Sequence, residues 1–176
     1  MGQLRALETA GLVAHRTERH GVGRPRHVFD VTPEARELFP TDYRGLAVGL
    51  VDAIVEVGGS ELLEAVFAAR RRQLGISVRE RVDELAADGS LAARTGALAR
   101  IQDERGYLAE VVIGSDGALR LVERNCAIHH VTADGGAACD AELDLFRDVL
   151  GTEVSRESHM PSGDRCCTYR VGPLPS

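Results

Sequence analysis

The chain has 176 residues, of which 44% are hydrophobic and 27% are charged, and its formal net charge at pH 7 is -6. This length allows one substantial domain, or a small domain joined to a medium one, and excludes a large multidomain enzyme. The composition is typical of a globular protein and excludes disordered and fibrous chains. No apolar run approaches the ~20 residues that span a bilayer, so we expect a cytoplasmic protein.

Charge and cysteine are unevenly distributed along the chain. Residues 1–40 carry six Arg and five acidic residues, whereas residues 111–176 carry six Arg and ten acidic residues. The negative net charge argues against a protein that is basic throughout, but it leaves room for a local basic patch. All four cysteines lie in the last third of the sequence: Cys126, Cys139, Cys166 and Cys167. In a cytoplasmic chain, such a group indicates a metal, iron-sulfur or redox site more than a disulfide framework.

The first forty residues contain signals for two helices and a hairpin. Apolar spacing predicts a helix over residues 2–10, which Gly11 ends. Residues 13–18 and 26–31 have strand character, and the Gly- and Pro-rich segment 20–25 joins them into a hairpin with a basic tip. Thr32 followed by Pro33 predicts the start of a second, brief helix that ends at Phe39 and Pro40.

Residues 41–105 have helical periodicity. We expect helices over residues 41–57, 60–72, 78–87 and 91–105, with a break at Gly58 and Gly59. The run Arg70, Arg71 and Arg72 lies near the end of the second of these predicted helices. Basic residues there complement the helix dipole, which accounts for the run without nucleic acid. Because no apolar stripe is wide enough for complete burial, we interpret this region as a connector between modules or subunits.

Beyond Gly106 the period changes from that of helices to that of strands. Residues 107–113 and 118–123 are predicted strands joined by a hairpin turn at residues 115–117. A helix over residues 137–150 stops at Gly151, and strands over residues 153–158 and 165–171 follow. The predicted fold class is α+β, with three parts: residues 1–40, a helical connector over residues 41–105, and a ββαββ domain over residues 106–176.

Periodicity also predicts the direction of the cysteine side chains. Cys139 shares a helix face with Leu143 and Phe146, so it points inward. On the last strand, alternation places Cys167 on the inward face and Cys166 on the opposite face. Cys126 follows the end of a strand, in a loop that can turn toward either of these two elements.

Three cysteines on separate elements can therefore meet at one site: Cys126, Cys139 and Cys167. Their spacing matches neither the paired cysteines of a zinc ribbon nor the tight run of a ferredoxin. A site built from them depends on the tertiary fold. A fourth ligand could be His159, His130, Cys166 or a nearby carboxylate, and the alternative is that the cysteines are small buried apolar residues.

Two groups of residues carry a resemblance to a known family. The first resembles the end of a recognition helix and the wing of a winged helix-turn-helix protein, and comprises residues 4–8 and 10–13, Gly23-Arg24-Pro25-Arg26, and Val31-Thr32. The second is similar to the C-terminal half of SufR-type regulators, and comprises residues 125–128, Cys139, Glu142-Leu143, Phe146, Leu150-Gly151, Gly163-Asp164-Arg165 and residues 167–170. SufR-type proteins are iron-sulfur cluster-binding repressors of cluster-assembly operons.

The resemblance implies a DNA-binding transcriptional repressor that senses an iron-sulfur cluster, either 4Fe-4S or 2Fe-2S, as a homodimer. It implies Cys126, Cys139 and Cys167 as cluster ligands. It makes the hairpin a DNA-binding wing, with these candidate contacts to double-stranded DNA: Arg5, Arg16, Arg19, Arg24 and Arg26. A complete winged helix-turn-helix has two or three further helices before the recognition helix, so we expect an N-terminally truncated form with weakened DNA binding.

Two alternatives complete the sequence-based expectations. One is a metal-binding sensor or dimerisation protein without DNA binding, which holds a cluster or structural zinc. The other is an enzyme, which we do not expect, because we find no acid-base pair, nucleophile elbow or phosphate loop. Gly21 and Gly23 lack the third glycine and the helix of a dinucleotide fingerprint.

Overall fold

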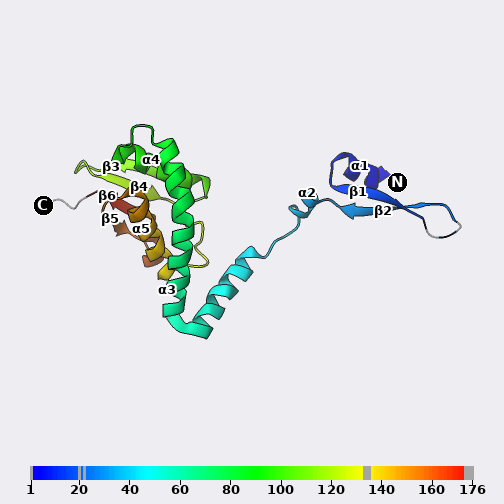
Figure 1. Ribbon diagram of the computed structural model, residues 1–176, viewed down its shortest axis with the longest axis horizontal. Helices are drawn as coiled ribbons and strands as arrows, with labels where there is room; N and C mark the ends of the chain where they lie inside the picture. Colours follow the sequence, from blue (N-terminus) through cyan, green and yellow to red (C-terminus); the bar gives the residue numbers. More distant parts are fainter. Residues whose placement is uncertain (1, 20, 22, 133–135, 173–176) are drawn as a thin grey trace. The chain divides into compact units, whose positions relative to one another are not determined.

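The computed structural model describes residues 2–19, 21, 23–132 and 136–172. These residues are mixed α and β, as the sequence predicts (Figure 1). The chain divides into two compact units, residues 1–43 and residues 44–176. The predicted connector, residues 41–105, therefore does not form a part of its own, because all but its first residues belong to the larger unit.

The N-terminal unit contains α1 (Gly2–Thr9), β1 (Val13–Glu18), β2 (Arg26–Val31) and α2 (Pro33–Arg36). The two strands pair antiparallel from Val13 opposite Val31 to Glu18 opposite Arg26. Gly11 has a φ of 72°, a conformation that favours glycine and turns the chain from α1 into β1. The predicted hairpin is thus present, although His20 and Val22 at its tip lie outside the described residues.

Thr32 connects the end of the hairpin to α2 and to the turn that follows α1. Its hydroxyl accepts a hydrogen bond from the Ala35 amide at 3.2 Å, as expected for the N-cap of α2. The same hydroxyl donates to the Gly11 carbonyl at 2.7 Å. Ala35 is the only buried residue among the described residues of this unit. A unit of this size buries little apolar surface, and Leu4 and Leu7 of α1 are each 40% exposed.

The larger unit begins with α3 (Tyr43–Leu85), which includes a kink. Gly59 has non-helical angles with a φ of 67°, at the position where the sequence predicts a break. The helix then continues to Leu85, so the predicted gap between residues 72 and 78 is absent. Gly75 faces α5, where a Cβ would lie 3.6 Å from Leu145 Cδ1. Arg70, Arg71 and Arg72 consequently lie in the middle of a helix, and the expected dipole role at a last turn does not apply.

A second helix and a four-stranded sheet follow. The elements are α4 (Leu91–Glu104), β3 (Ala109–Ile113), β4 (Leu119–Glu123), α5 (Ala137–Leu150), β5 (Val154–Ser158), the 3-10 turn η1 (Met160–Ser162) and β6 (Cys167–Val171). The strands are antiparallel and ordered β3-β4-β6-β5 across the sheet. Ser90 caps α4 by accepting from the Ala93 amide at 3.2 Å, and Gly151 ends α5 in the left-handed conformation.

The core lies between this sheet and the helices beside it (Figure 1). Phe146 of α5 packs edge-on against Tyr169 of β6, with ring centroids 4.9 Å apart. Val82 of α3 and Leu98 of α4 are completely buried in the same core. The middle helices are therefore structural parts of the larger unit, which their narrow apolar stripes do not predict. No helix of the described residues is long and apolar enough to cross a membrane.

Candidate functional site

The three cysteines proposed as ligands come from three elements of the larger unit. Cys139 lies near the start of α5 and is 6% exposed, and Cys167 begins β6 and is 5% exposed. Cys126 is half-buried in the loop after β4. The inward direction of Cys139 and Cys167 is therefore confirmed, because both side chains are buried.

The pKa of the Cys139 thiol depends on burial and on the charges around it. Burial raises the pKa of the Cys139 thiol to about 12, and negative charge at Glu142 adds to the shift. Charges on Cys126 and Cys167 act in the same direction, while Arg156 opposes them. Negative charge on Cys126 or Cys167 would thus disfavour a thiolate at Cys139.

Hydrogen bonds orient two of these thiols. The Met160 amide donates to Cys167 Sγ at 3.4 Å, and Cys126 Sγ lies 3.6 Å from the hydroxyl of the buried Thr132. Burial raises the pKa of Cys167 as well. A metal would therefore have to displace protons from these thiols before their sulfurs could act as ligands. Among the described residues, no group of three or more His, Cys, Asp or Glu side chains is arranged to hold a metal ion.

The three candidate fourth ligands differ in their surroundings. Cys166 lies near hydroxyls, with its Sγ 3.9 Å from Ser158 Oγ and 3.6 Å from Thr168 Oγ1. His130 packs against His129 with ring centroids 3.7 Å apart.

His159 has a buried ring nitrogen that lacks a partner. Its Nε2 makes no hydrogen bond to any described residue, while its Nδ1 lies 3.1 Å from Ser162 Oγ. If Nδ1 donates to that hydroxyl, Nε2 keeps a free lone pair. Burial lowers the pKa of His159, and nearby Arg156 adds to the effect, so the ring is neutral near neutral pH. A neutral imidazole with a free nitrogen is the form of histidine that binds metals.

A buried acidic network lies beside the cysteines. Gln102 Nε2 donates to Glu123 Oε1 at 2.9 Å and lies 3.5 Å from Glu142 Oε1. The Tyr169 hydroxyl donates to Glu142 Oε2 at 3.1 Å. Burial raises the pKa of Glu123 to about 9, and the neighbouring Glu142 contributes. Burial likewise raises the pKa of Glu142.

Each residue of this network carries a signal in the sequence, but local pattern does not combine the three into a site. Glu123 alternates with the buried Leu121 on β4, and Gln102 follows the buried Leu98 by one helical turn. Glu142 lies three residues after Cys139, on the same side of α5. Cys167 is the cross-strand partner of Glu123, so the network and the cysteines share elements.

The candidate DNA contacts fall into two groups in the N-terminal unit. Arg16 is paired with Glu18 and Asp30, and Arg26 is paired with Glu18 at 3.2 Å. The other three are exposed and take part in no ion pair among the described residues: Arg5, Arg19 and Arg24. Arg19 and Arg24 flank the hairpin tip, whereas Arg5 lies on α1.

No protein-family model, curated protein or solved structure matches this chain.

Proposed function

We propose that this protein is a transcriptional regulator that represses iron-sulfur cluster assembly genes and senses cluster status through cysteines of its C-terminal ββαββ elements. The observation that supports it most is that Cys139 and Cys167 are buried on a helix and a strand of one unit, with Cys126 half-buried in the loop after β4. Three thiols on separate elements form a site that exists only in the folded chain. Loss of a group bound there would release all three elements together.

We propose the cluster ligands as these three thiols and His159. The unpartnered, buried Nε2 of His159 supports its choice over Cys166, whose sulfur has hydroxyl neighbours, and over the stacked His130. A bound cluster would supply a group that responds to oxygen and to iron supply. The three thiols would lose their protons and hold the group together with His159, and the buried surroundings of Cys139 and Cys167 would exclude water.

DNA binding is proposed for the N-terminal unit, as a partial winged helix in which the hairpin is the wing. Arg19 and Arg24 have no acidic partner among the described residues, so their guanidinium groups can contact phosphates or enter a minor groove. Arg5 would contribute from the recognition helix α1. Arg16 and Arg26 would have to exchange their carboxylate partners for phosphate.

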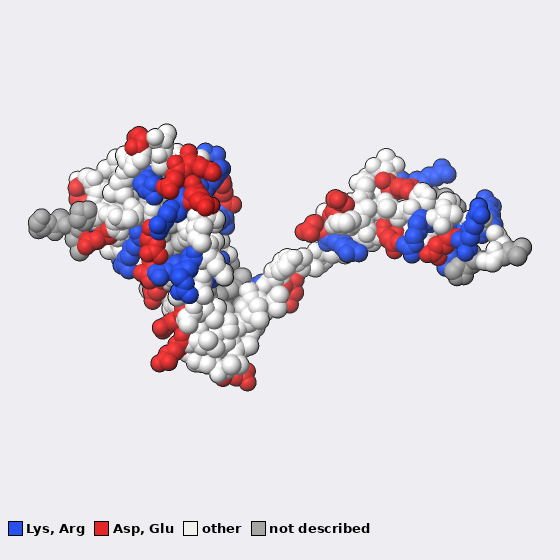
Figure 2. All heavy atoms as spheres, in the orientation of Figure 1, with Lys and Arg blue, Asp and Glu red and all other residues white. Residues whose placement is uncertain are grey.

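A homodimer is proposed through the first part of α3. Tyr43, Leu50 and Val57 recur every seven residues and are 73%, 55% and 82% exposed, and Leu46 between them is 59% exposed. A repeat of seven is the spacing of helix pairs that pack in parallel or antiparallel coiled coils. Figure 2 shows few charged atoms where α3 bends, in contrast to the mixed charges over the rest of this unit. Paired copies would present two wings to the two half-sites of an operator.

A second candidate is a metal-binding sensor or dimerisation protein, with a cluster or structural zinc, that does not bind DNA. The pairing of Arg16 and Arg26 with acidic residues favours it, because it leaves the N-terminal unit with little uncompensated positive charge. Binding of fluorescent duplexes from the promoters of cluster-assembly genes separates the two candidates. The regulator requires affinity for such a duplex that changes when the cluster is removed. Equal and weak binding to every duplex, with and without the cluster, supports the second candidate.

A further inference from the structure

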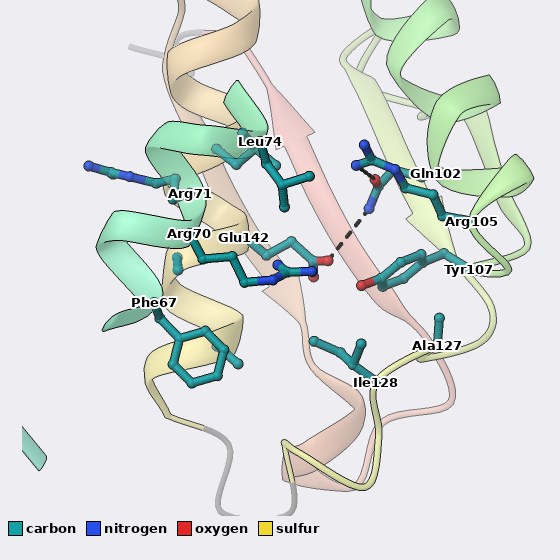
Figure 3. A pocket seen from close by; sticks show the side chains of 13 residues that line it. Phe67, Arg70, Arg71, Leu74, Gln102, Arg105, Tyr107, Ala127, Ile128 and Glu142 are labelled. Atoms are coloured by element: carbon teal, nitrogen blue, oxygen red, sulfur yellow. Dashed lines mark hydrogen bonds between the residues drawn. The ribbon is translucent and has the colours of Figure 1, made fainter. Parts of the chain in front are cut away.

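The larger unit contains a cavity of about 340 Å³ that the proposed regulator does not use. Helices α3, α4 and α5 border it, together with the segments on either side of the β3-β4 hairpin (Figure 3). Its volume lies at the lower end of the range for small-molecule sites, which is ~300–1,000 Å³. Because α5 and the loop after β4 also carry Cys139 and Cys126, the cavity shares elements with the cysteine site.

One wall of the cavity is apolar. Phe67 and Leu74 of α3 and Ile128 from the loop after β4 line it (Figure 3), and Leu145 of α5 is a further apolar residue of the lining. A cavity with apolar walls and a few polar groups at one side is the usual form of a site for a small organic molecule. Replacing water in the cavity by an apolar group would remove this surface from water, which is favourable.

The polar side of the cavity has an excess of positive charge. Arg70 and Arg105 reach it from α3 and from the end of α4, and Glu142 is the one acidic side chain in the lining (Figure 3). The oxygens of Glu142 already accept from the Tyr169 hydroxyl and lie near the Gln102 amide. Two guanidinium groups therefore face a carboxyl group whose hydrogen-bonding capacity is partly used.

Arg70 and its neighbour Arg71 differ in their partners. Arg71 is paired with Asp144 at 2.8 Å and lies 3.6 Å from Asp148. The guanidinium of Arg70 forms no hydrogen bond and no ion pair with any described residue, and its positive charge acts on Glu142 only from a distance. Within the part of the chain that the structure describes, Arg105 donates one long hydrogen bond of 3.5 Å, to Gln102 Oε1. The planar donors of Arg70 are thus available for a ligand.

We propose that this cavity binds a small organic monoanion, a carboxylate on an apolar body, with Arg70 as its main anchor. The guanidinium group can hold a carboxylate through two parallel hydrogen bonds, and the apolar wall covers the body of the ligand. A phosphate dianion fits less well, because the apolar wall would leave its oxygens without hydrogen-bond partners. The inference is independent of the proposed cluster, since it uses none of the cysteines.

The test is a titration of the full chain, without a cluster, with benzoate. Benzamide serves as the neutral analogue of the same shape, and binding is followed through the methyl NMR signals of Leu74 and Ile128. We expect saturable shifts of both signals with benzoate and much weaker shifts with benzamide. Arg70→Gln should weaken benzoate binding about tenfold or more, the usual effect of losing hydrogen bonds to a charged group.

Arg72→Gln is the matched control, because Arg72 lies on the same helix but outside the lining of this cavity. It should change benzoate affinity by less than about twofold. The proposal is wrong if benzoate leaves both methyl signals unmoved, if benzamide binds as tightly as benzoate, or if the two arginine variants lose affinity equally. Arg70 and Arg72 are both exposed, so each variant should keep the remaining methyl spectrum of the folded protein.

Discussion

Replacing the buried Glu123 by Gln should stabilise the protein at neutral pH. Glu123 is 1% exposed, and its pKa is raised to about 9 by burial and by Glu142. The folded chain therefore keeps a proton that the unfolded chain, with an ordinary carboxyl pKa near 4.3, has lost. The favourable contribution is complete below the unfolded pKa and is lost as the pH rises toward the folded pKa.

The magnitude follows from the width of that pH window. Each pH unit between the two pKa values lowers the free energy of unfolding by about 1.4 kcal/mol per group, so the loss from pH 5 to pH 7 is about 2–3 kcal/mol. Gln cannot ionise, and its carbonyl oxygen can still accept from Gln102 Nε2, which now donates to Glu123 at 2.9 Å. The free energy of unfolding of Glu123→Gln should thus decline less between pH 5 and pH 8, by about 1.4 kcal/mol per pH unit.

Urea unfolding at pH 5, 6, 7 and 8 measures this difference. The control is Glu110→Gln on β3, where the carboxylate is exposed and paired with Arg124. That substitution should change stability by less than about 1 kcal/mol at every pH. If the free energy of unfolding of the Glu123 variant fell with pH as steeply as that of the unmodified protein, the buried acid would not be protonated in the folded state.

Three further predictions concern the core, the wing and the dimer. Leu98→Ala should lower the free energy of unfolding of the larger unit by about 2–5 kcal/mol, because Leu98 is fully buried, and a loss below 1 kcal/mol would show that α4 is not part of the core. Arg24→Ala should weaken duplex binding and reduce the slope of log affinity against log salt concentration by about one, whereas Arg36→Ala in α2 should change neither. Equal slopes in both variants would show that the wing does not contact DNA. Leu50→Glu should shift the sedimenting species from dimer to monomer, while Asp52→Asn on the other side of the helix should leave the dimer unchanged. A dimer that persists in Leu50→Glu would place the interface elsewhere.

Local pattern predicts the elements well where capping and period agree. The hairpin, the cap at Thr32, the kink at Gly59 and the end of α5 at Gly151 all follow from short signals in the sequence. The inward direction of Cys139 and Cys167 follows for the same reason, since each element shows a single face to the core.

Contacts between distant segments are what local pattern misses. The middle helices carry few large apolar residues, yet Val82 and Leu98 are buried because α5 and the sheet supply the rest of the core. The role of Arg71 depends on Asp144 and Asp148, more than seventy positions further along the chain, and no helical period contains that information. The acidic network likewise combines Gln102, Glu123 and Glu142 from three elements.

The central claim is that Cys126, Cys139 and Cys167 bind one iron-sulfur cluster, and anaerobic reconstitution of single Cys→Ser variants tests it most directly. Iron content and visible absorption are measured on the full chain and on each variant, with Cys166→Ser as the control. Cys126 gives the cleanest comparison, because it lies half-buried in a loop and its replacement leaves the core intact. We predict that the full chain and Cys166→Ser bind iron with visible absorption, and that Cys126→Ser loses most of both. Retained iron and colour in Cys126→Ser, or a colourless full chain that binds zinc in place of iron, would contradict it.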